Sequence, residues 1–163
     1  MQKIRFIDFR NPSKREFGKG IDFHTFFKYM FENYGYFMKG VFGEMGVDVS
    51  CWPDGNLELI EQCEDPIAIL IIPDILGDGK EISEKDFPKD IPVIIFSHPL
   101  VPKSAIPNAE NVYPINLRDF FERLRDMLNG MRAPQDENER NKIRDFCDWV
   151  LGICDAIDEL FKF

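Results

Sequence analysis

Acidic and hydroxyl side chains follow the apolar segments of this chain, at the points where strands would end. Asp74 comes just after the apolar run 67–72, and Asp8 and Ser97 end two further apolar segments. Open α/β sheets bind ligands in the crevice beyond the carboxyl ends of their strands. We therefore expect Asp74 to lie in such a crevice. The alternative is that these residues are only the polar ends of strands and carry no chemistry.

Two continuous apolar runs predict the strands that would position these side chains. Residues 67–72 (IAILII) and 91–97 (IPVIIFS) are bounded by turn residues, as is typical of strands buried on both faces of a parallel sheet. Shorter apolar segments predict three more strands, at 3–9, 47–52 and 112–115.

Apolar residues at steps of three and four predict helices between and after the strands. The longest would start after Asp22, a good N-cap, and stop at Gly46, with a kink or break at Gly35. The other helices are expected over 56–63, over 117–131, and after a linker at 133–137.

Strands and helices that alternate in this way predict an α/β fold. We expect a doubly wound, five-stranded parallel sheet with an additional C-terminal helix. The chain has 163 residues, which fits one domain with an appended helix. The expected division is a domain over 1–132 and an amphipathic helix over 133–163, packed on the domain or at a dimer interface.

Charge and composition restrict the class of partner. The chain carries 29 acidic and 20 basic residues, and a net charge of -9 repels the phosphate backbone of nucleic acids. Residues 1–10 lack a continuous hydrophobic segment, so we expect neither a signal peptide nor a membrane span. The four cysteines lack the spacing of a zinc site, which predicts free thiols in a cytoplasmic protein.

The middle of the chain resembles a response-regulator receiver domain of the two-component signalling systems. The stretch GVDVSCWPDGNLELIEQCEDPIAILIIPDILGDG, residues 46–79, has the receiver order of strand, Asp-Gly turn, helix and buried strand ending in aspartate. The likeness covers about residues 3–130 and implies a flavodoxin-like sheet. It also implies that Asp74 is the phosphoacceptor, that Asp8 and Asp74 bind Mg²⁺, and that Ser97 is the hydroxyl partner of the phosphoryl group.

Two positions depart from the receiver pattern. Phe9 stands where a second acidic residue follows Asp8, and Tyr113 stands where a lysine precedes Pro114. The first change should weaken Mg²⁺ binding, and the second removes the cation that would neutralise the phosphoryl charge. The prolines between 99 and 114 also leave no room for a normal fourth helix. The resemblance thus implies a pseudo-receiver that acts by binding another protein, with little phosphorylation at Asp74.

Two other interpretations stay open. The segments FIDFRN and LIEQCEDPIAILIIPDI are similar to a TIR-type domain, some of whose members cleave NAD with a glutamate while others are signalling adaptors. Glu84 lies at about the distance of that glutamate from its strand, although the Trp-Cys pair that usually precedes it is absent. The third interpretation is a structural subunit that forms a homodimer through its aromatic helices. Apart from Mg²⁺ no cofactor is expected, since GxGxxG and GxxxxGK[ST] are both missing.

Overall fold

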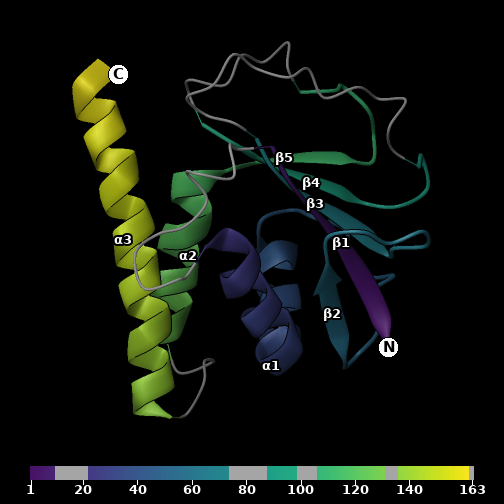
Figure 1. Ribbon diagram of the computed structural model, residues 1–163, viewed down its shortest axis with the longest axis horizontal. Helices are drawn as coiled ribbons and strands as arrows, with labels where there is room; N and C mark the ends of the chain where they lie inside the picture. The colour runs from purple at the N-terminus through teal and green to yellow at the C-terminus, as the bar shows by residue number, and fades with distance from the viewer. Residues whose placement is uncertain (10–21, 74–87, 99–105, 131–135, 162–163) are drawn as a thin grey trace. The chain divides into compact units, whose positions relative to one another are not determined.

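A five-stranded parallel sheet runs through the first two thirds of the chain (Figure 1). The spatial order is β2-β1-β3-β4-β5, the order of flavodoxin-like folds. The predicted α/β class, with five parallel strands and a C-terminal helix, is confirmed. The strands are β1 (Gln2–Asp8), β2 (Leu57–Ile60), β3 (Ala68–Ile72), β4 (Val93–Ser97) and β5 (Val112–Asn116). The computed structural model describes residues 1–9, 22–73, 88–98, 106–130 and 136–161.

β3 is an interior strand, as its continuous apolar sequence predicts. All five of its residues are buried, and it pairs with β1 on one side and β4 on the other. Successive side chains alternate between the two faces of the sheet. Leu70 shares one face with Phe6 of β1, whereas the opposite face holds an aliphatic cluster of Ile69, Ile71, Val93 and Ile95.

α1 (Phe23–Glu44) covers the face of the sheet that carries Phe6. The Phe27 ring lies 6.2 Å from the ring of Phe6 and 5.6 Å from that of Phe96 on β4. Both predicted ends are confirmed: the Asp22 carboxylate accepts a hydrogen bond from the Thr25 N–H at 2.7 Å, and Gly46 follows the helix with a φ of 87°. The backbone departs from helical angles at Tyr34, one residue before Gly35, where the sequence predicts a kink.

The predictions of a strand over 47–52 and a helix over 56–63 are wrong. Asp48 accepts hydrogen bonds from the Ser50 N–H and hydroxyl, which folds this segment into a turn. Leu57 and Leu59 then point inward from β2, because their spacing of two residues suits a strand beside β1. The connection from β2 to β3, residues 61–67, contains no helix.

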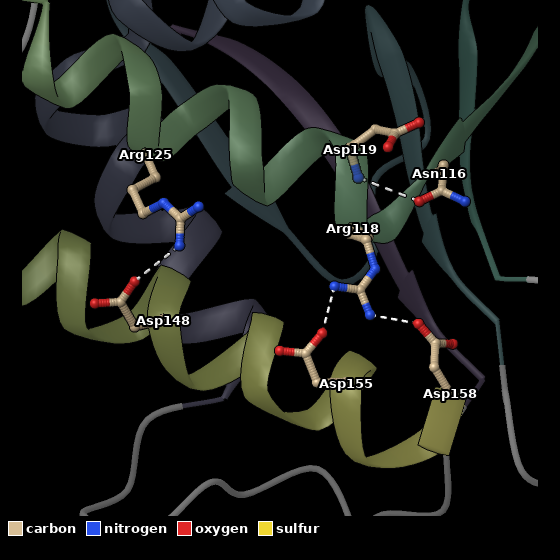
Figure 2. Close-up of polar contacts among 7 residues, drawn as sticks. All are labelled: Asn116, Arg118, Asp119, Arg125, Asp148, Asp155 and Asp158. Atoms are coloured by element: carbon tan, nitrogen blue, oxygen red, sulfur yellow. Dashed lines mark hydrogen bonds and ion pairs between the residues drawn. The ribbon is translucent and has the colours of Figure 1, made fainter. Parts of the chain in front are cut away.

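α2 (Leu117–Asn129) and α3 (Glu137–Phe161) pack against each other (Figure 2). Both helices are predicted, and the Asn116 side chain caps α2 by accepting from the Asp119 N–H at 3.1 Å. Arg118 is paired with Asp155 at 2.6 Å and also with Asp158. Apolar residues fill the space between the two helices, among them Phe121 and Phe146, whose ring centroids lie 6.0 Å apart.

Contacts divide the chain into two compact units, Met1–Ile115 and Asn116–Phe163. The second unit therefore holds both α2 and α3. The proposed domains 1–132 and 133–163 stay a prediction about organisation, and most of the predicted linker at 133–137 lies outside the described residues.

Candidate functional site

The candidate site lies at the carboxyl edge of the sheet, where β1, β3 and β4 end side by side. Asp8 closes β1 and pairs with Ile72 of β3, and the next residue, Phe9, donates its N–H to the Ile72 carbonyl at 2.9 Å. Ser97 is the last residue of β4. It comes two residues after Ile95, which pairs with Ile71 of β3. Asp8 and Ser97 therefore flank the end of β3, with Cα atoms about 10 Å apart at the usual strand spacing.

The side chains of Asp8 and Ser97 project from opposite faces of the sheet. Asp8 is two residues after Phe6, on the face that α1 covers. Ser97 is two residues after Ile95, which belongs to the aliphatic cluster on the other face. The fold thus brings the two predicted residues to one edge but does not turn them toward each other.

Other residues named from the sequence lie elsewhere. Asp74 and Glu84 fall in the segment 74–87, outside the described residues. Asp54, in the Asp-Gly turn of the receiver resemblance, precedes β2 and so lies toward the amino edge of the sheet. Its carboxylate is 3.1 Å from the Lys39 ammonium, which also donates to the Trp52 carbonyl at 2.7 Å. The Asp54 carboxylate therefore helps to hold the turn.

Two histidines lie on the face of Asp8. The His24 ring, in the first turn of α1, is 5.4 Å from the Phe6 ring, and its Nε2 is buried without a hydrogen-bond partner in the described part of the chain. His98 follows Ser97 and is only 5% exposed, and continued alternation places it on the same side as Phe96. The sequence alone does not indicate that these histidines share a face of the sheet with Asp8. The strand pairing is needed to show it.

The described residues contain no set of three or more His, Cys, Asp or Glu side chains placed to hold a metal ion. The four cysteines are free thiols, as the sequence predicts. Burial raises the pKa of the Cys147 thiol to about 12 and that of Cys154 to about 11. Both are therefore protonated, and weak nucleophiles, near neutral pH.

No family model, curated protein or solved structure matches this chain. Within the described ranges, every helix is too short or too polar to span a lipid bilayer.

Proposed function

We propose that this protein is a pseudo-receiver signalling domain that works by binding another protein and not by accepting a phosphoryl group. The observation that carries the proposal is the arrangement at the carboxyl edge. Asp8 and Ser97 flank the end of β3, as in the receiver pattern, but they project from opposite faces. A phosphoryl group on the intervening strand would need its cation ligand and its hydroxyl donor on the same side.

Two sequence departures support the same proposal. Phe9 provides no second carboxylate, and it packs against the aliphatic cluster on the face opposite α1. Tyr113, on β5, stands in place of the lysine. Mg²⁺ prefers several oxygen ligands, so an edge with fewer carboxylates should bind it weakly. Without Mg²⁺ and phosphorylation this edge would not switch between two states. A partner protein would then recognise the unphosphorylated edge.

The described part of the connection between β4 and β5 also bears on the partner surface. Residues 106–111 contain bend and turn structure and no helix. A receiver normally presents the helix of this connection to its output partners. The prolines between 99 and 114 also disfavour that helix, so the partner of this chain would bind a different surface. The carboxyl edge around Asp8 is the candidate, since open α/β sheets bind their ligands there.

Phosphoryl donors test this proposal directly. Acetyl phosphate or beryllofluoride with Mg²⁺ should leave the mass and the amide NMR spectrum of the protein unchanged, because the edge lacks a complete phosphoryl site. Asp54→Asn is the matched control, since Asp54 lies toward the opposite edge. Stoichiometric phosphorylation that persists in Asp54→Asn but disappears in Asp74→Asn would overturn the pseudo-receiver proposal.

Incubation with NAD separates the TIR-like interpretation from the pseudo-receiver. The pseudo-receiver should release no nicotinamide above the background of buffer alone. Glu81, three residues before Glu84 in the sequence, provides the control. Release that is lost in Glu84→Ala but kept in Glu81→Ala would instead identify the protein as an NAD-cleaving enzyme.

A further inference from the structure

One side of α3 is buried, and a row of exposed residues runs along another side of the helix. The buried residues include Phe146, Val150 and Cys154. The exposed row follows alternating steps of three and four residues, the spacing that forms the seam of a coiled coil. Its members, all exposed, are Lys142, Asp145, Trp149, Gly152, Ala156 and Glu159. We call this row the outer seam.

The middle of the outer seam combines a large ring with an open space. Trp149 is 40% exposed, and the tryptophan ring is among the most favourable side chains to bury at an interface. A Cβ added at Gly152 would meet no atom within 4 Å. A ring from another molecule could therefore approach the α3 backbone closely at Gly152.

The outer seam is complementary to itself in the antiparallel direction. Around a two-fold axis between Trp149 and Gly152, Trp149 of one copy faces Gly152 of the other, and Asp145 faces Ala156. Lys142 then faces Glu159, so opposite charges meet at both ends of the seam. A parallel pair would instead place Lys142, Asp145 and Glu159 each against the same residue in the copy, which brings like charges together.

We propose that two copies of this chain associate through the outer seams of α3 in an antiparallel, two-fold symmetric pair. Such an interface uses the same patch on both molecules. The seam is about 26 Å long at the usual helical rise, and its only large apolar residue is Trp149. One helix pair of this size is smaller than a standard stable interface, so the dimer should be weak and should depend on concentration. The proposal does not rest on the pseudo-receiver function, because the receiver resemblance ends before α3.

Sedimentation velocity on the full chain, from about 1 μM to about 500 μM, tests the association. The wild-type protein should shift from monomer to dimer across this range. Trp149→Ala should raise the dimer dissociation constant at least about tenfold, because it removes the central ring. Tyr36→Ala is the matched control: Tyr36 is an aromatic residue, 71% exposed, on α1, and its removal should leave the dissociation constant unchanged.

Charge reversal tests the antiparallel register. Lys142→Glu should weaken the dimer at low ionic strength, and adding Glu159→Lys should restore it. The two positions are about 26 Å apart along one helix, so they cannot pair within one copy. Lys142→Glu combined with Glu32→Lys, an exposed position on α1, restores the same net charge and should leave the dimer weakened. Circular dichroism checks that each variant keeps its helices. A monomer at every concentration, equal effects of Trp149→Ala and Tyr36→Ala, or a double variant with Glu159→Lys no stronger than Lys142→Glu would each overturn the proposal.

Discussion

Cys147 and Cys154 lie on the buried side of α3, and their surroundings control their protonation. Burial disfavours the thiolate and raises the pKa of Cys147 from 9.0 to about 12. Cys51, in contrast, is exposed in the turn before β2. The protein should therefore react with a thiol reagent first at Cys51, since the thiolate is the reactive form and must be accessible.

Because the pKa of Cys147 is raised, the free energy of unfolding should fall as the pH becomes alkaline. A group whose folded pKa exceeds its unfolded value stabilises the fold fully below the unfolded pKa, here 9.0, and this contribution is lost as pH rises toward about 12. The loss for this thiol is at most about 1.4 kcal/mol per pH unit. Urea unfolding at several pH values above about 9 should show this decline, and Cys147→Ala should reduce it, with the part due to the buried Cys154 thiol remaining.

The Cys51→Ala variant is the control for this measurement. Its stability should decline with pH as that of the wild-type protein does, because Cys51 is exposed in the turn before β2 and the buried thiol of Cys147 is unchanged. A Cys147→Ala variant with the wild-type slope would show that other groups cause the alkaline loss.

The edge position of the candidate site residues could be predicted from the sequence, but their orientation could not. Polar residues at the ends of apolar runs indicated that Asp8 and Ser97 would share an edge of the sheet. β3 and β4 are buried on both faces, so their sequences contain no alternation that would reveal which side chains share a face. The pairing of β1 with β3 and of β3 with β4 was needed to show that Asp8 and Ser97 face apart.

Arg118 and Arg125 join the elements α2 and α3 in unequal ways (Figure 2). The Arg118 guanidinium is paired with both Asp155 and Asp158, and its side chain is 27% exposed. Arg125 is paired only with Asp148 in this figure, at 3.3 Å, with a side chain that is 38% exposed. Solvent screening reduces the stabilising energy of an ion pair less when two carboxylates hold the guanidinium than when the pair is single and exposed.

Replacing Arg118 should therefore destabilise the fold more than replacing Arg125. We expect Arg118→Ala to lower the free energy of unfolding by about 1 kcal/mol and Arg125→Ala by about 0.3 kcal/mol. Denaturant unfolding with a common slope for all variants measures both values. Equal losses, or a larger loss in Arg125→Ala, would contradict the assigned roles of the two ion pairs.

Long elements could be predicted well because each has a strong periodic signal. α1 repeats aromatic and apolar residues over 22 positions, and its ends carry Asp22 and Gly46. β2 has only four residues, and Leu57, Leu59 and Ile60 resemble a helical stripe as much as a strand. The segment becomes a strand because it pairs with β1, which is distant in the sequence. The local sequence pattern alone does not reveal that pairing.

The order of the strands in the whole sheet sets an expected order of local stability. β3 has a strand on each side and no exposed residue, whereas β2 stands at the end of the sheet that the described residues form, paired with β1. Amide hydrogens in β3 should therefore exchange most slowly, and those in β2 should exchange earliest among β1, β2 and β3. Native-state hydrogen exchange followed by NMR or mass spectrometry measures this order. Protection of β2 equal to that of β3 would show that the sheet opens only as one unit.

The four-residue length of β2 has a consequence for solubility. The outer side of a terminal strand is a template on which foreign chains can add and begin a fibril. β2 has only four residues, so few backbone groups are available for such pairing, and Glu58 places a carboxylate within the strand. Cross-β growth is therefore discouraged at this edge, and lengthening the strand with further apolar residues would be expected to promote aggregation.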